Sequence, residues 1–247
     1  MRLYERLYLP KENIRVDIWK DEFIRMTTQP VKNPRNLPHI KADMVSNSKM
    51  LAHDYYYLEN KAEAKKAAKN LLDYTKEFFF GKWRIEVPGY KGNTENWIEQ
   101  FRQSICWGSC LGEWEKVKEL AEYPRDEVID AERWEPIEWR CWYLLIAGVL
   151  RGQPLGDFKK YVKTIGSGKK IREKLLLNLL IPILDSDIKN AEYALNEYLK
   201  YFKKYEFPRP GKNDLLCIDG TFLINFAAYK GLKLEYPSEY EDHIVKL

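Results

Sequence analysis

One stretch of the chain decides the fold class: it runs from Lys61 to Phe80 and reads KAEAKKAAKNLLDYTKEFFF. Alanine and lysine, which are good helix formers, fill its first half, and neither proline nor glycine interrupts it. Its small and apolar residues recur every three or four positions, the spacing that places side chains on one face of an α-helix: Ala64, Ala67, Ala68, Leu71, Leu72 and Thr75. We therefore predict one long amphipathic helix here.

Helical spacing continues on both sides of this stretch, and turn residues separate the successive segments. Patterns typical of β-strands are almost absent. We expect further helices around residues 46–58, 97–110, 113–121, 136–150, 158–162, 175–184, 187–202 and 215–230. The sequence therefore predicts an all-α fold, an irregular bundle or solenoid of antiparallel helical hairpins with roughly nine helices. The spacing of the aromatic positions and turns varies too much for a regular tetratricopeptide array.

The first part of the chain has a different pattern. Pro30, Pro34 and Pro38 follow one another at short intervals, and proline disfavours helix both at its own position and at the residue before it. We therefore predict an N-terminal arm over residues 1–44, with short helices and a proline-rich extended passage. The helical core is predicted to span residues 45–247, as one domain with the arm packed on it.

The overall composition favours a folded protein with no general affinity for polyanions. The chain has 247 residues, 45% of them hydrophobic, and 41 basic against 37 acidic residues give a formal net charge of +4. This near balance predicts no nucleic-acid partner and no anionic membrane partner. The longest apolar runs are about ten residues, and a membrane-spanning helix needs about 20. We expect a cytoplasmic protein without a secretory leader.

The residues that most often carry out catalysis are few and scattered. The three histidines, His39, His53 and His243, stand far from one another and from any cysteine at metal-ligand spacing. Cys106 and Cys110 are four residues apart, but no further ligand lies near them in the sequence, so we predict buried free thiols. Motifs for nucleotide binding, serine hydrolysis and zinc binding are missing. We expect no enzymatic activity, no cofactor and no metal; the enzyme alternative is a metal held by scattered Asp and Glu residues.

A glycine-rich run, Gly166-Ser167-Gly168, precedes Lys169 and Lys170. Such a run at the start of a helix can hold an anion on backbone N–H groups. Here no strand precedes it and the spacing is not that of a nucleotide-binding motif. We interpret it as a turn between two helices.

Charge is unevenly distributed along the chain. Residues 113–138 contain ten acidic and four basic side chains, whereas residues 159–174 contain seven basic side chains and only Glu173 as an acid. The acidic segment suits a partner with a basic groove, and its tryptophans suit an interface anchor. The other interpretation is a solvated helix face. The candidate partner-binding residues are Glu115, Glu119, Glu122, Asp126, Trp114 and Trp134.

Three segments resemble the immunity protein 49 family of bacterial polymorphic-toxin systems. The first runs from Asn96, Trp97 and Ile98 to Pro124 and contains two consecutive helix patterns. The second is EWRCWYL at residues 138–144, and the third is FLINFAAYKGL at residues 222–232, followed by the tail around Tyr236 to Tyr240. The resemblance lies mainly in the spacing of apolar residues, and the three segments together cover about half of the chain.

The resemblance implies an all-α antitoxin that blocks a cognate toxin by direct binding, with the toxin encoded by an adjacent gene. It brings no catalytic or interface residues that can be carried over. The alternative is a helical-repeat scaffold or adaptor that holds a peptide or protein partner on a concave surface.

Overall fold

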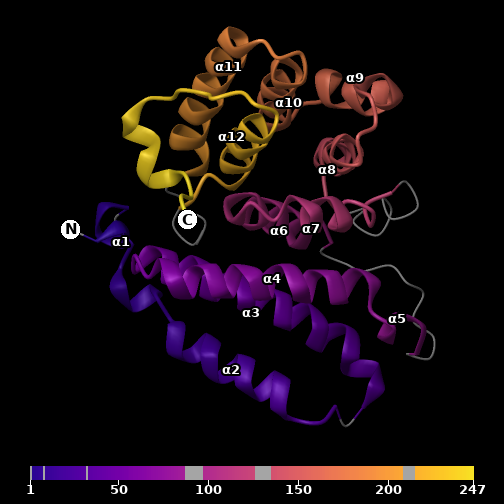
Figure 1. Cartoon of the computed structure of the whole chain (residues 1–247), viewed down its shortest axis with the longest axis vertical. Helices are drawn as coiled ribbons and strands as arrows, with labels where there is room; N and C mark the ends of the chain where they lie inside the picture. The colour runs from indigo at the N-terminus through magenta and orange to yellow at the C-terminus, as the bar shows by residue number, and fades with distance from the viewer. Residues whose placement is uncertain (1, 8, 32, 87–96, 126–134, 208–214) are drawn as a thin grey trace. The chain divides into compact units, whose positions relative to one another are not determined.

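The computed structural model describes residues 2–7, 9–31, 33–86, 97–125, 135–207 and 215–247 (Figure 1). Over these residues the chain forms twelve α-helices, with several 3₁₀ turns and one π-helical turn, and no strand. The predicted all-α fold is confirmed. The described residues form two compact units, one of residues 1–123 with Leu247 and the other of residues 124–246.

The first unit stacks its helices in chain order. Successive elements α2, α3, α4, α6 and α7 each pack against the next (Figure 1). Its helices and 3₁₀ turns are α1 (Leu3–Arg6), η1 (Lys11–Asn13), α2 (Val16–Thr28), η2 (Pro34–Asn36), α3 (Leu37–Tyr57), α4 (Lys61–Phe80), α5 (Trp83–Glu86), α6 (Trp97–Leu111) and α7 (Trp114–Leu120).

Helix α4 has the bounds that the sequence predicts. Asn60 caps it, because the side chain of Asn60 accepts a hydrogen bond from the backbone N–H of Glu63 at 3.3 Å. The face with the three- and four-residue spacing is buried, with Leu71 and Leu72 almost fully inaccessible. The predicted long amphipathic helix is confirmed.

The N-terminal region differs from the prediction. Pro38 does not prolong an extended passage; it lies in the first turn of α3, which begins at Leu37. Proline is tolerated there, because the first N–H groups of a helix have no partner within the helix. The boundary predicted between residues 44 and 45 therefore falls inside α3, and the division between the two compact units lies after Tyr123.

The second unit is organised around α10, which packs against α8, α9, α11 and α12. Gly231 follows the end of α12 with a φ of 85°, a left-handed conformation that favours glycine. The elements are α8 (Ile137–Leu150), η4 (Leu155–Phe158), α9 (Lys159–Ser167), α10 (Ile171–Leu184), α11 (Ile188–Tyr201), the π-helical turn η5 (Phe202–Glu206), α12 (Ile218–Tyr229) and η6 (Ser238–His243).

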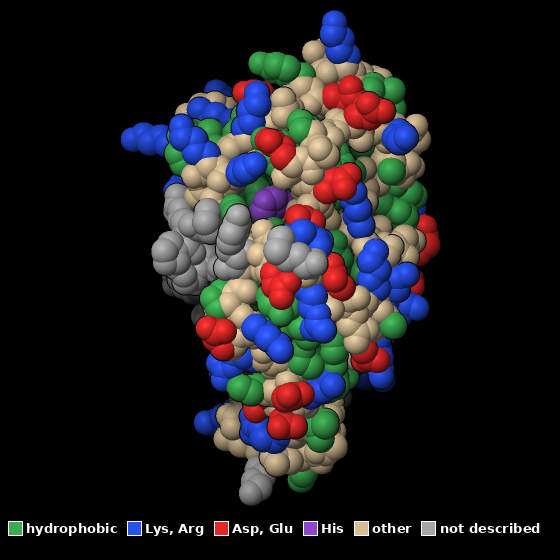
Figure 2. All heavy atoms as spheres, turned by 90° about the vertical axis from the view of Figure 1, so that its left-hand side faces the viewer, with side chains coloured by type: hydrophobic (Ala, Val, Ile, Leu, Met, Phe, Trp, Pro, Cys, Tyr) green, Lys and Arg blue, Asp and Glu red, His purple; other side chains and the backbone are tan. Residues whose placement is uncertain are grey.

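Surface charges of opposite sign are interspersed. On the face drawn in Figure 2, lysine and arginine lie among aspartate and glutamate, with apolar side chains between them. Ion pairs within the units include Arg6–Glu59 at 3.3 Å, Lys203–Glu239 at 3.8 Å and Lys246–Glu241 at 3.4 Å. In the part of the chain that the structure describes, no helix is both long and apolar enough to cross a membrane.

Candidate functional site

The α10–α11 hairpin of the second unit carries a groove of about 540 Å³ between its two helices. Its floor is apolar and consists of partly or fully buried residues, among them Leu175, Ile181 and Ala194, while the ring of Tyr193 is 69% exposed at its edge. The groove follows matching stripes on the two helices, because the lining residues recur every three or four positions on each. They are Leu175, Asn178, Ile181, Pro182, Asp185, Asp187, Asn190, Tyr193, Ala194 and Glu197.

The polar rim of this groove, which we call the acidic groove, has one sign of charge. Asp185, Asp187 and Glu197 supply three carboxylates, and neither lysine nor arginine is among the residues that line it. A groove with an apolar floor and an acidic rim is complementary to an amphipathic segment that carries basic side chains.

Two of the three carboxylates make local interactions. Asp187 caps α11 and accepts hydrogen bonds from the Asn190 backbone N–H at 3.1 Å and from Asn190 Nδ2 at 2.5 Å. These bonds lower the pKa of Asp187, so it is ionised at neutral pH. Glu197 pairs with Lys200, one turn further along the exposed side of α11, at 2.9 Å. Asp185 follows the last residue of α10 and is exposed.

A network of charged residues in the interior of the second unit connects α10 to neighbouring elements. The Arg172 guanidinium donates to the carboxylates of Glu173 at 3.0 Å, of Glu206 at 2.9 Å and of Asp219. The Tyr143 hydroxyl donates to the other Asp219 oxygen at 2.6 Å. The five residues come from α8, α10, η5 and α12. The network therefore joins α10 to α8, η5 and α12. The opposite face of α10, which lines the acidic groove, is turned toward solvent.

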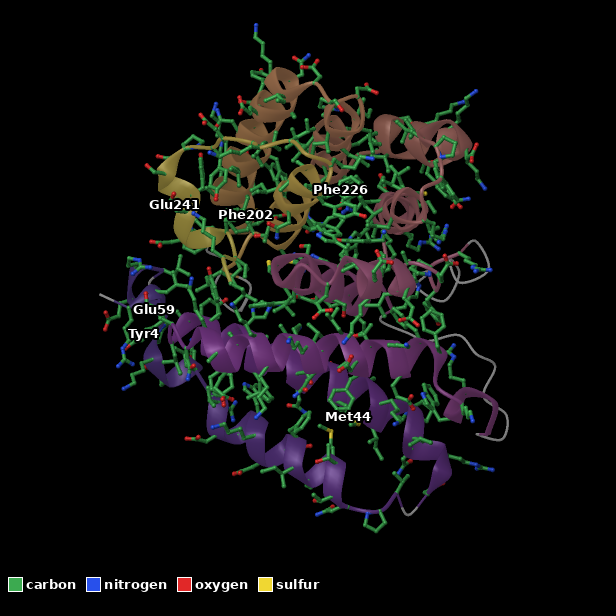
Figure 3. All side chains as sticks on the ribbon, in the orientation of Figure 1. Tyr4, Met44, Glu59, Phe202, Phe226 and Glu241 are labelled. Atoms are coloured by element: carbon green, nitrogen blue, oxygen red, sulfur yellow. The ribbon has the colours of Figure 1, made fainter. Side chains whose placement is uncertain are left out.

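Burial affects the charges and thiols in the interior of this unit, where Phe202 and Phe226 are also buried (Figure 3). Burial opposes the charge of Arg172, but attraction by Asp219 and other anionic groups holds its pKa well above the usual value. Burial also raises the pKa of the Cys217 thiol, which is fully buried, so Cys217 is not a nucleophile at neutral pH.

The turn before α10 binds an anion from within the protein. Glu138 of α8 accepts a hydrogen bond from the Lys169 backbone N–H at 2.9 Å, at the position where a glycine-rich turn would hold a ligand anion. A Cβ atom at residue 168 would lie 2.4 Å from the Glu138 side chain, so a larger residue there would displace Glu138. The predicted turn at residues 166–168 is misplaced: Gly166 and Ser167 belong to α9, and residues 168–170 connect α9 to α10.

Of the candidate partner-binding residues, Glu115 and Glu119 form an acidic stripe on α7 of the first unit. Glu115 and Glu119 point outward from α7, opposite the buried Val117, as expected. Both carboxylates pair with lysines, however: Glu115 with Lys118 at 2.9 Å and Glu119 with Lys76 at 2.8 Å. These pairs reduce the negative potential of the stripe.

The other candidate residues do not extend this stripe within the described structure. Helix α7 ends at Leu120, so Glu122 lies in the turn that follows it and does not share its face. Trp114 is half-buried at the start of α7. Asp126 and Trp134 lie outside the described residues.

The histidines and cysteines have structural environments. His53 is buried and donates from Nε2 to the Gln103 side-chain oxygen at 3.0 Å. His243 is also buried and donates from Nδ1 to the backbone oxygen of Leu215 at 2.9 Å. All four cysteines are free, and three of them are buried. Among the residues with described positions, no group of three or more His, Cys, Asp or Glu side chains could hold a metal ion.

Comparisons with protein-family models, with curated proteins and with solved structures give no match to this chain.

Sequence reasoning did not find the acidic groove. Neither the three rim carboxylates nor the exposed Tyr193 was among the candidate partner-binding residues. The available signal was the repeated three- and four-residue spacing of Leu175, Asn178 and Ile181 beside that of Asn190 and Tyr193. That spacing predicts a face on each helix, but it does not predict that the two faces lie side by side.

Proposed function

We propose that this protein is an immunity protein that binds a cognate toxin and blocks it by covering a basic surface. The observation that carries the proposal is the acidic groove, which has three carboxylates on its rim and no basic residue in its lining. An interface of this kind attracts a basic partner electrostatically and then buries apolar surface against it. The resemblance of three sequence segments to the immunity protein 49 family supports a toxin as that partner.

The acidic groove is a better candidate for the contact surface than the stripe on α7. Glu115 and Glu119 of the stripe each have a lysine within 3 Å, and Glu197 of the groove pairs in the same way with Lys200. Asp185, however, is exposed at the mouth of the groove beside Asp187, whose hydrogen bonds come from the neutral Asn190. The groove also offers an apolar floor, which the exposed outer face of α7 does not.

The test is co-expression with the product of the adjacent gene. We expect a stable complex and loss of the neighbour's toxicity. Asp185→Lys combined with Glu197→Lys should weaken binding about 10- to 100-fold, because it places like charges against a basic partner. The matched control, Glu115→Lys with Glu119→Lys and Glu122→Lys, should leave affinity almost unchanged.

Each possible result has a defined meaning. Failure of the two proteins to associate, with toxicity undiminished, would contradict the immunity function. Loss of binding only in the control variant would place the interface on α7 instead. An adaptor that holds a peptide is the second candidate, since the same groove suits a basic amphipathic peptide; it predicts binding to partners that are not toxins.

A further inference from the structure

Helix α9 of the second unit has an outward face on which lysine is the only charged residue type. The helix packs on α8 and α10 at the edge of the unit (Figure 1). Its Tyr161 and Ile165 are buried, whereas Lys159, Lys160 and Lys163 are all exposed. Successive residues of an α-helix are turned by about 100°, which places the three lysines together on the side opposite Tyr161 and Ile165.

The basic surface continues beyond the end of α9. Lys169 and Lys170 are exposed in the connection to α10, and Ile171, the first residue of α10, is 60% exposed. Ile137 of α8 is 41% exposed and adjoins Glu138, whose carboxylate accepts the hydrogen bond from the Lys169 N–H. Two exposed isoleucines therefore accompany the lysines. The lysine surface, as we call it, consists of Lys159, Lys160, Lys163, Lys169, Lys170, Ile171 and Ile137.

The lysine surface has almost no counter-charge of its own. None of its lysines forms an ion pair with a residue in the described ranges. The elements that pack against α9, namely α8, η4 and α10, contain three acidic residues. Glu138 is buried and engaged with the Lys169 N–H, and Glu173 is buried and paired with Arg172 at 3.0 Å. Only Asp157 of η4 is exposed, so the surface attracts anions.

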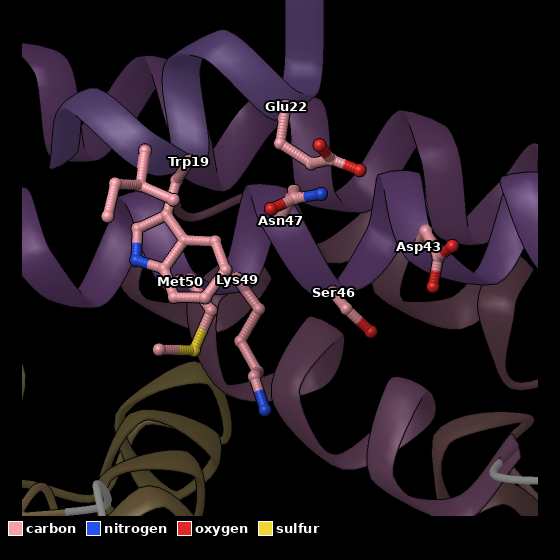
Figure 4. Close-up of a pocket in the computed structure, with 8 residues that line it drawn as sticks. Trp19, Glu22, Asp43, Ser46, Asn47, Lys49 and Met50 are labelled. Atoms are coloured by element: carbon pink, nitrogen blue, oxygen red, sulfur yellow. The ribbon is translucent and has the colours of Figure 1, made fainter. Parts of the chain in front are cut away.

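Lys49 of the first unit has the opposite surroundings. It lines a hollow of about 410 Å³ between α2 and α3 together with Glu22 and Asp43 (Figure 4), and its ammonium lies 3.6 Å from Glu99. The net charge of +4 averages over such mixed surfaces and the lysine surface. Attraction to a partner depends instead on the charges within about 10 Å of the contact. The expectation of no anionic membrane partner rested on the average.

We propose that the lysine surface docks on an anionic lipid bilayer. The negative potential of the lipid headgroups attracts each lysine that comes near them, and these attractions add. Gly166 and Ser167, on the same side of α9, are small, so the longer lysine side chains extend beyond them. Ile171 and Ile137 would enter the boundary between headgroups and acyl chains, where burial of apolar side chains is favourable.

A nucleic acid fits this surface less well than a bilayer. Proteins that bind single strands stack the bases on exposed aromatic rings, but the aromatic residues of this region, Phe158 and Tyr161, are buried. Two-point recognition of phosphates or guanine bases is typical of arginine, and the lysine surface contains none. Exposed isoleucines favour a bilayer, because they gain nothing from a phosphate backbone.

The experiment is sedimentation of the purified full chain with lipid vesicles. Vesicles of phosphatidylcholine mixed with phosphatidylglycerol should bind at least about tenfold more tightly than vesicles of phosphatidylcholine alone. High salt should release the protein, because it screens the attraction between lysines and headgroups. Equal binding to both kinds of vesicle, or binding to neither, would overturn the proposal.

Variants locate the contact. Lys159→Gln combined with Lys163→Gln should weaken binding to the anionic vesicles about tenfold or more. The matched control, Lys65→Gln with Lys69→Gln, removes two exposed lysines with the same spacing from α4 and should bind like the parent protein. Ile171→Gln should weaken binding about threefold or more, because it removes the apolar contact and leaves the charge unchanged. All five substituted residues are exposed, so the variants should fold.

Three outcomes would contradict the proposal. An equal loss in the α4 control would show a general charge effect, and unchanged binding by Ile171→Gln would remove the argument for a lipid surface. Tighter binding to duplex DNA than to the anionic vesicles, lost in the α9 variant, would assign the surface to nucleic acid. None of these results depends on whether a toxin binds the acidic groove.

Discussion

The two units bury an aspartate in different ways. Asp54 in α3 of the first unit accepts hydrogen bonds from two neutral groups, the Arg15 backbone N–H at 2.8 Å and the Trp19 indole N–H at 3.1 Å. Asp219 in α12 of the second unit accepts from the Arg172 guanidinium and from Tyr143.

The difference has an electrostatic consequence. Burial raises the pKa of Asp54 to about 6, although its two hydrogen bonds oppose the shift. Around Asp219 a full positive charge is shared among three carboxylates, so the anions depend on Arg172. Neutral N–H donors hold the Asp54 carboxylate, whereas a formal positive charge neutralises the carboxylate of Asp219.

The largest expected effect comes from removing the shared positive charge. Arg172→Met should destabilise the second unit by about 3–5 kcal/mol, because it leaves buried carboxylates without their counter-ion. Amide hydrogen exchange should accelerate in α10 and α12 while α4 of the first unit stays protected. Lys163→Met, an exposed change on α9, is the control. Equal stability of Arg172→Met and the parent protein would show that the network contributes little.

The next effect concerns Asp54, whose hydrogen bonds come from neutral donors. Because the pKa of Asp54 is higher in the folded state than in the unfolded chain, the folded state binds more protons between about pH 4 and pH 6, and the free energy of unfolding falls as pH rises through this range. Asp54→Asn keeps an acceptor for both N–H groups and removes this titration. We expect the variant to match the parent near pH 4 and to exceed its stability by about 2–3 kcal/mol near pH 7.

Urea unfolding of both proteins at several pH values measures this difference. Tyr143→Phe, which removes the hydroxyl that donates to Asp219, provides the comparison in the second unit. The difference in free energy of unfolding between Tyr143→Phe and the parent should not vary over the same pH range. Parallel pH profiles for Asp54→Asn and the parent would contradict the account of Asp54.

The smallest expected effect tests the carboxylate that lies at the turn before α10. Gly168→Ala should lower the free energy of unfolding by about 1–2 kcal/mol. The added Cβ overlaps the Glu138 side chain and disturbs the hydrogen bond that Glu138 accepts from the Lys169 N–H. Thermal unfolding measures the loss. Gly166→Ala, two residues earlier in α9, meets open space and should be neutral or slightly stabilising. A similar loss in both variants would attribute the effect to the backbone of the turn and not to Glu138.

Helix positions could largely be predicted from local chemistry. The run of Ala and Leu in residues 61–80, Pro136 before α8, Asp187 before α11 and Gly231 after α12 all mark boundaries that the structure has within a few residues. These signals act within one or two turns of helix, so they can be recognised in a single sequence. Pro38 was misinterpreted because the same residue ends one helix and begins another, depending on the backbone N–H groups around it.

The sites could not be predicted in the same way. Glu119 on α7 pairs with Lys76 on α4, and Asp219 on α12 depends on Arg172 of α10. The sequence by itself determined the fold class, the helix faces and the local caps, because these follow from periodicity and nearest neighbours. Only the tertiary structure decided which charges are neutralised and which stripes face each other across a groove, because those contacts join residues far apart in the chain.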